Sequence, residues 1–138
     1  MPESPTESTR ELFAHASRLL AHSWNQRLTE LGITYAGYLA LAAAAADPVS
    51  HQAALAKALY VRTPTIGSTL DRLEYQGHVH TYRSPVDTRY RLVRVTAHGH
   101  YVLRMGREIE RSLLAGSEGL RDQLLLLLPQ LMQQPGAA

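Results

Sequence analysis

The chain has 138 residues, a formal net charge of +2 and no cysteine, a size typical of one domain. Hydrophobic residues make up 45% and charged residues 19%, which excludes a disordered or fibrous protein. Without cysteine there are no disulfides, thiolate metal sites or thiol redox chemistry. The longest apolar run, residues 35–46, is too short to cross a membrane, and the first residues do not form a secretory signal. We therefore expect a cytoplasmic protein without a membrane partner.

The first part of the chain predicts two helices. Apolar residues at spacings of three and four indicate a long helix over residues 10–31, and Gly32 is a typical residue to end it. Thr34 is expected to cap a second helix, which continues through an alanine-rich stretch until Asp47 stops it.

Two shorter helices are predicted next. We expect Ser50 to cap the third helix and Thr63 to precede the fourth, with Pro64 at its first helical position. Gly77 is expected to close the fourth helix.

The hydrophobic pattern changes to a period of two after the fourth helix. Residues 79–83 and 90–95 predict two strands of a hairpin with a polar, basic loop between them. Thr96 is expected to cap a helix that runs to about residue 114, and residues 118–132 predict a last, leucine-rich helix.

This order of helices, hairpin and helices is that of a winged helix-turn-helix protein with an added helical scaffold. We expect one mainly α domain over residues 1–138 with a small β hairpin. A winged-helix lobe, residues 33–99, would lie on a helical dimerisation scaffold formed by residues 10–32 and 100–134. The leucine-rich last helix has more apolar side chains than a monomer easily covers, which predicts a two-fold homodimer.

Charge is unevenly distributed along the chain. Residues 49–104 contain 8 basic and 3 acidic residues, a net charge of +5, and the remainder has a net charge of −3. A basic middle between acidic ends is typical of a nucleic-acid reader on a separate scaffold, although chance fluctuation of surface charge is an alternative.

The predicted fourth helix has two faces. Ile66, Leu70 and Leu73 form an apolar stripe, and a second, polar stripe is rotated away from it. The polar stripe consists of Thr65, Ser68, Thr69 and Arg72. Short hydroxyl side chains let a helix approach base edges closely, and Arg72 can bind guanine or a phosphate. The alternative is a solvated helix face.

The remaining candidate DNA contacts are at the start of this helix and in the hairpin: Arg62, Thr63, Arg83, Asp87, Arg89 and Arg91. Thr63 is interpreted first as a cap, although a helix N-terminus also binds phosphate. Arg89 is expected in the minor groove, whose negative potential attracts a guanidinium. Asp87 is expected to orient an arginine such as Arg89 through a bidentate pair. Arg83 and Arg91 are interpreted as phosphate contacts or solubilising charges.

Residues at matched spacing carry a resemblance to a known family. They are Leu55, Ala56, Leu59, Thr63, Pro64, Thr65, Leu73, Glu74, Gly77, Val79, Asp87, Arg89, Val93, Val95, Thr96 and Gly99. In this respect residues 33–99 resemble the MarR family of bacterial transcription regulators. Thr88 stands where the family usually has arginine, and Tyr60 where it often has glycine. The resemblance implies a DNA-binding regulator, and two-fold symmetry would require a pseudo-palindromic double-stranded operator.

An effector pocket is a further candidate site. Family members bind small aromatic or phenolic effectors, so the resemblance implies a repressor that such a ligand releases. The candidate pocket residues are Trp24, Arg27, Tyr35, Tyr38, Tyr101, Arg104 and Met105. Core packing explains the aromatic residues among them equally well.

No metal, cofactor or catalytic site is expected. His78 and His80, like His98 and His100, are two residues apart, a spacing that converges only on a strand. The sequence has no Gly-rich phosphate loop, nucleophile elbow or paired-carboxylate cluster. The alternative to a DNA-binding regulator is a winged-helix module that binds protein or RNA without an operator.

Overall fold

The computed structural model describes residues 6–48 and 50–134. The elements, in chain order, are α1 (Thr9–Thr29), α2 (Tyr35–Ala46), α3 (Gln52–Ala58), α4 (Thr63–Tyr75), β1 (Val79–Arg83), β2 (Arg91–Val95), α5 (Ala97–Leu113) and α6 (Leu120–Met132). The strands pair antiparallel, with Val79 opposite Val95 and Arg83 opposite Arg91. The predicted fold class, mainly helical with one hairpin, is therefore confirmed.

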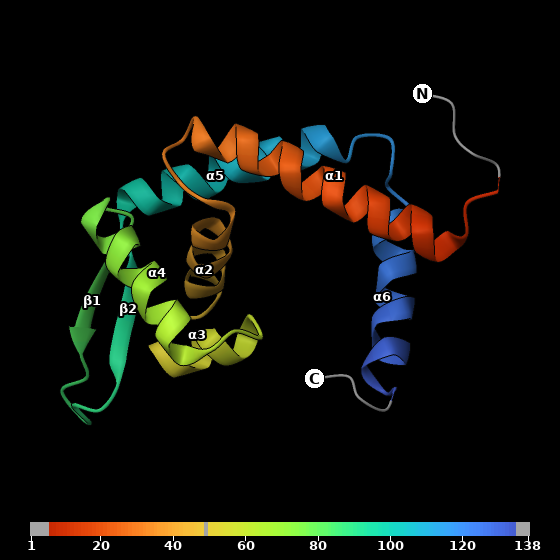
Figure 1. Cartoon of the computed structure of the whole chain (residues 1–138). Helices are drawn as coiled ribbons and strands as arrows, with labels where there is room; N and C mark the ends of the chain where they lie inside the picture. Colours follow the sequence, from red (N-terminus) through yellow and green to blue (C-terminus); the bar gives the residue numbers. More distant parts are fainter. Residues whose placement is uncertain (1–5, 49, 135–138) are drawn as a thin grey trace.

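The helices and the hairpin divide into two groups in space (Figure 1). Helices α1 and α5 lie against each other along one edge of the molecule. The helices α2 to α4 and the hairpin, which we call the lobe, lie beside one end of this pair, and α6 projects beside the other end. In the described part of the chain, no helix is long and apolar enough to cross a membrane.

The buried side chains form one core that joins the lobe to α1 and α5. The largest fully buried apolar residues are Leu28, Leu41, Leu70, Leu73, Val102 and Leu103. These come from α1, α2, α4 and α5. Because one core contains residues of all four helices, packing holds α4 on the α1–α5 pair.

The predicted start is confirmed for α2 and α5 and is wrong for α3 and α4. Thr34 and Thr96 cap α2 and α5 as predicted, each hydroxyl accepting a backbone N–H at 3.0 Å. The prediction for α3 is wrong, because His51 is its cap residue and Nδ1 of His51 accepts from the backbone N–H of Ala54. Ser50 is buried and its hydroxyl donates to carbonyl oxygens at the end of α2. Ser50 thus stabilises the preceding helix.

Helix α4 begins one residue earlier than predicted. Arg62 occupies the cap position without a side-chain capping bond, Thr63 is the first helical residue and Pro64 the second. Proline is tolerated there because the first N–H groups of a helix have no partner within it. Nε2 of Gln52 donates to the carbonyl oxygen of Thr63 at 3.0 Å, which fixes the start of α4 against α3.

The turn between α3 and α4 is closed by Tyr60, which stands where the family often has glycine. It has a φ of 56°, the left-handed conformation that glycine adopts most easily. Its N–H donates to the carbonyl oxygen of Lys57, and the N–H of Val61 donates to that of Ala56. This pair of bonds is the Schellman closure of a helix, with Tyr60 at the position where glycine is usual. The departure from the family pattern is thus accommodated by backbone strain at one exposed residue.

Replacing Tyr60 with glycine is expected to stabilise the protein. A non-glycine residue in this conformation costs roughly 1–2 kcal/mol, and glycine loses about 0.5–1 kcal/mol through the entropy of the unfolded chain. We therefore expect Tyr60→Gly to raise the free energy of unfolding by about 0.5–1 kcal/mol in urea denaturation at fixed protein concentration. Tyr60→Val is the matched control and should lower it, because a β-branched residue fits this conformation poorly. Equal stability of the two variants would contradict this explanation.

Candidate nucleic-acid interface

The polar stripe of α4 is on the molecular surface, opposite the core. Ile66, Leu70 and Leu73 are at most 3% exposed, as the apolar stripe predicted. On the other stripe, Thr65, Ser68 and Arg72 are exposed and Thr69 is partly buried. The hydroxyl of Thr69 donates to the carbonyl oxygen of Thr65 at 3.0 Å, so its oxygen can still accept from an outside donor. Within residues 6–48 and 50–134, Arg72 forms no ion pair, and its guanidinium is available to a ligand.

We call the β1–β2 hairpin with its loop, residues 79–95, the wing. Hydrogen bonds fix the conformation of its loop. The buried hydroxyl of Ser84 accepts from the backbone N–H groups of Val86 and Asp87, both at 3.2 Å. The N–H of Ser84 donates to the carbonyl oxygen of Tyr90 at 3.0 Å. The loop therefore holds its tip in a defined position beyond the strands.

Asp87 and Arg89 form the predicted bidentate pair. Nε of Arg89 donates to Oδ1 of Asp87 at 3.0 Å, and NH2 donates to Oδ2 at 2.7 Å. These bonds lower the pKa of the Asp87 carboxyl and raise that of the Arg89 guanidinium. The side chain of Arg89 is 84% exposed, so the pair orients a cation that faces solvent. The expectation that Asp87 orients Arg89 is confirmed.

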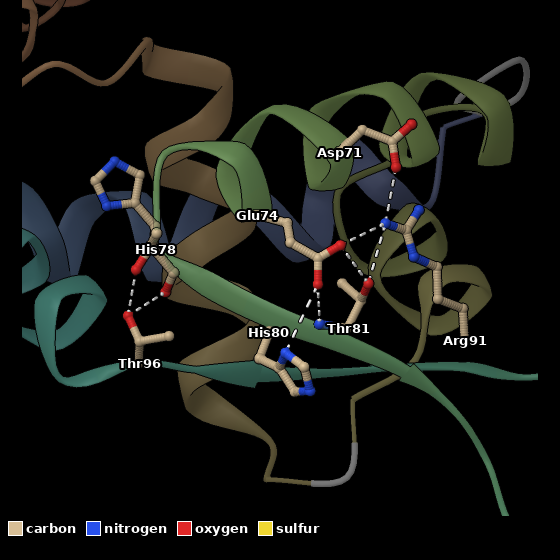
Figure 2. Close-up of polar contacts among 8 residues, drawn as sticks. Asp71, Glu74, His78, His80, Thr81, Arg91 and Thr96 are labelled. Carbon is tan, nitrogen blue, oxygen red and sulfur yellow. Dashed lines mark hydrogen bonds and ion pairs between the residues drawn. The ribbon is translucent and has the colours of Figure 1, made fainter.

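Arg83 and Arg91 differ although they are opposite each other in the hairpin. Arg83 is exposed, as either interpretation of it requires. The side chain of Arg91 is only 16% exposed, and its NH2 donates to Oδ1 of Asp71 at 2.8 Å and to the hydroxyl of Thr81 at 3.2 Å (Figure 2). Arg91 is therefore engaged within the lobe and is not a solvated surface charge.

A link between α4 and the wing was missed by the sequence reasoning. Oε2 of Glu74 accepts from the backbone N–H of Thr81 at 2.7 Å, and Oε1 accepts from the hydroxyl of Thr81 at 2.8 Å. These bonds lower the pKa of the Glu74 carboxyl, with a smaller contribution from Arg91. The only sequence signal for this contact was a glutamate near the end of the fourth helix, shortly before the first predicted strand. Figure 2 shows that Glu74 connects the last turns of α4 to β1.

The histidines pair across the two sequence clusters. His78 is 2% exposed, and its ring stacks on that of His98 with centroids 4.9 Å apart and an interplanar angle of 11°. Burial, and secondarily His98, lowers the pKa of His78. Stacked rings do not point their nitrogens at a common ion. Among the described residues, no group of three or more His, Asp or Glu side chains could hold a metal.

The candidate effector residues occupy three different environments. Trp24 and Tyr38 are buried core residues, with ring centroids 5.2 Å apart, and Tyr35 packs edge-on against Trp24. Tyr101 is 45% exposed, and the guanidinium of Arg104 lies 5.8 Å from the centre of its ring. The structure thus assigns packing to Trp24 and Tyr38.

The last two effector candidates line a cleft between α1 and α5. Its lining residues are Arg27, Glu30, Leu31, Met105, Glu108 and Ile109, and its volume is about 370 Å³. Arg27 and Met105 therefore lie together, but Tyr101 and Arg104 are not part of the lining.

An apolar groove runs between α1, α5 and α6. It has a volume of about 490 Å³ and is lined by Phe13, Ala16, Ser17, Leu19, Leu20, Ser23, Leu113, Leu114, Ser117, Leu120 and Leu124. Helix α6 has no buried residue. Leu126 and Met132 on it are 66% and 63% exposed. An exposed apolar surface of this kind is typical of an interaction site.

Comparison with known proteins identifies the fold. No protein-family model matches the chain, and neither does any curated protein sequence. Among solved structures, MepR from S. aureus in complex with DNA is 24% identical, with 91% of this chain and 97% of that one aligned at a TM-score of 0.74. A MarR mutant from E. coli in complex with operator DNA is 24% identical over 83% and 88% of the two chains, with a TM-score of 0.69.

A third similar structure is BpsR from Bordetella bronchiseptica, whose DNA binding is regulated by 6-hydroxynicotinic acid. It is 19% identical over 97% of this chain and 99% of that one, with a TM-score of 0.74. The three alignments cover 83% to 97% of this chain, more than the 33–99 segment alone. The chain therefore has the winged-helix fold of the MarR-family regulators, as the residues of segment 33–99 predicted.

Proposed function

We propose that the chain is a dimeric, sequence-specific DNA-binding transcriptional regulator. The observation that carries the proposal is the exposed polar stripe of α4 beside a wing whose Arg89 is held outward by Asp87. Helix α4 would enter the major groove, with Thr65, Ser68 and Arg72 toward the base edges. Arg89 would lie in the adjacent minor groove. The DNA complexes of the similarly folded MarR and MepR support this arrangement.

The apolar groove supports a homodimer built from α1, α5 and α6. A second copy would cover the exposed side chains of α6, and its two-fold axis would present the two α4 helices symmetrically. The operator would then be pseudo-palindromic, with half-sites about one helical turn, roughly 34–36 Å, apart.

The regulator would act as a repressor that a small aromatic acid releases. The cleft beside Arg27 and Met105 is the candidate site: Arg27 could pair with the acid, and Leu31, Met105 and Ile109 could pack against its ring, while Glu30 and Glu108 in the same lining would oppose a second negative charge. It lies between α1 and α5, so a ligand there could alter the spacing of the two lobes. Regulation of BpsR by 6-hydroxynicotinic acid is a further support. Coupling of this kind typically changes DNA affinity by about 1–3 kcal/mol.

The test is selection of bound fragments from a random duplex library, followed by two substitutions. On the selected duplex we expect Arg72→Ala to cost about 1–3 kcal/mol and to relax base preference at one position of each half-site. Arg89→Ala should weaken binding to all sequences and reduce the slope of log affinity against log salt by about one unit for each wing.

Arg10→Ala is the matched control, since it removes an arginine that is 80% exposed on α1, outside the lobe. It should leave affinity and salt slope unchanged. If the library yields no enriched sequence, or if Arg72→Ala and Arg89→Ala bind like Arg10→Ala, the proposed function is wrong.

A further inference from the structure

Arg91 connects the recognition helix to the wing. It belongs to β2, but its guanidinium lies across β1 against α4 (Figure 2). NH2 of Arg91 is 2.8 Å from Oδ1 of Asp71 and 3.8 Å from Oε1 of Glu74. One cation therefore serves two carboxylates on neighbouring turns of α4 and also donates to the hydroxyl of Thr81 on β1.

The two carboxylates would otherwise oppose DNA binding. Asp71 directly precedes Arg72, and its side chain is 72% exposed on the helix proposed to enter the major groove. A free carboxylate there would repel phosphates and weaken association. Asp71 and Glu74 are three residues apart on one helix, so they would also repel each other without a shared cation. By pairing with both carboxylates, Arg91 reduces the repulsion between Asp71 and DNA phosphates and the repulsion between Asp71 and Glu74.

The geometry does not fit Arg91 as a DNA contact. Its side chain is 16% exposed, and NH2 is already occupied by Asp71 and Thr81. A phosphate could therefore reach only the Nε and NH1 donors of a side chain that is largely covered by the lobe. Arg94, on the same strand, is exposed and lies with its guanidinium 5.5 Å from the centre of the Tyr82 ring. Arg94 therefore serves as a comparison for an arginine that is free to reach a ligand.

We propose that Arg91 is a positioning residue for DNA binding. It neutralises Asp71 and holds the recognition helix against the wing, and it does not itself contact the DNA. This role rests on the proposed function, because it concerns the affinity of the same surface for an operator.

The test uses duplex binding across a salt titration, on the sequence that the wild-type protein selects. Arg91→Ala is expected to lower affinity about tenfold or more, because Asp71 becomes an unpaired negative charge on α4. Adding Asp71→Asn to that variant should restore at least half of the loss on a logarithmic scale. Asparagine removes the repulsion but cannot replace a phosphate contact, so the double variant should also regain the wild-type salt slope.

Arg94→Ala is the matched control, since it removes the same charge from the same strand. Asp71→Asn should not rescue any loss that it causes. The proposal is overturned if Arg91→Ala binds like wild type, or if the double variant stays as weak as Arg91→Ala. In either case wild-type binding to the selected duplex shows that the proposed function itself still holds. Failure of the wild-type protein to select any duplex would instead reject the proposed function.

Arg91→Lys keeps the test decisive if the alanine variant does not fold, as judged by circular dichroism. It retains the positive charge, but a single ammonium group cannot reproduce the fork that reaches Asp71 and Thr81. We expect a smaller loss of affinity than for alanine, again recovered by Asp71→Asn. A lysine variant whose loss is not recovered would overturn the proposal.

Discussion

A Leu124→Glu variant is expected to be monomeric and to bind the selected duplex roughly 100-fold or more weakly than wild type, since two linked lobes bind far more tightly than one. Leu124 lines the apolar groove together with Phe13 and Leu113. A glutamate there would place an unpaired carboxylate where the partner copy of the proposed dimer would pack, which costs several kcal/mol. The lobe should remain folded because α6 contributes no residue to its core.

Sedimentation velocity at micromolar concentration measures the first effect and duplex binding the second. Gln123→Glu is the control, because it adds the same charge to α6 at an exposed, already polar position that does not line the groove. It should stay dimeric and bind like wild type. A Leu124→Glu variant that remains a dimer with wild-type affinity would remove the groove from the proposed interface.

Features that depend on local sequence were predicted well. The two stripes of α4 follow from helical geometry alone, and the burial of Ile66, Leu70 and Leu73 confirms the assignment of its faces. The hairpin was predicted from its period of two, with β2 one residue shorter than expected. The Asp87–Arg89 pair could be predicted because two residues in one short loop cannot lie far apart.

Features that depend on contacts between distant segments could not be predicted. The two carboxylate partners of Arg91 lie on α4, 17 and 20 residues away, and no periodic pattern connects them. A strand arginine looks the same in sequence whether it faces solvent or a helix carboxylate. The sequence alone therefore gives Arg91 and Arg83 the same interpretation, a phosphate contact or a surface charge.

The sequence also cannot tell whether a buried aromatic residue lines a ligand pocket or packs in the core. Trp24 and Tyr38 fit both a ligand pocket and a core, because either use places them on the inner face of a helix. The decisive contact is that of Tyr38 with Gly106 on α5, where an added Cβ atom would overlap the tyrosine ring. This close packing leaves no space for a ligand at that point, and only the three-dimensional structure contains the information.

Gly99→Ala is expected to lower the free energy of unfolding by about 1–3 kcal/mol, the typical cost of overpacking a closely packed site. An added Cβ atom would overlap the carbonyl oxygen of His78 and lie 2.8 Å from Cγ1 of Val95. The same carbonyl accepts hydrogen bonds from the N–H and the hydroxyl of Thr96, so it cannot move without breaking the start of α5 away from the wing. This contact explains physically why glycine stands at this position.

Urea denaturation at fixed protein concentration measures the loss, and the result should run against the usual preference of helices for alanine. Gly119→Ala is the matched control, because a Cβ atom there would meet no atom within 4 Å. Its stability should stay within about 1 kcal/mol of wild type. If Gly99→Ala is as stable as Gly119→Ala, the junction between the wing and α5 is looser than the structure describes. The rigid coupling of the wing to α5 that the proposed two-fold operator spacing requires would then lose its structural basis.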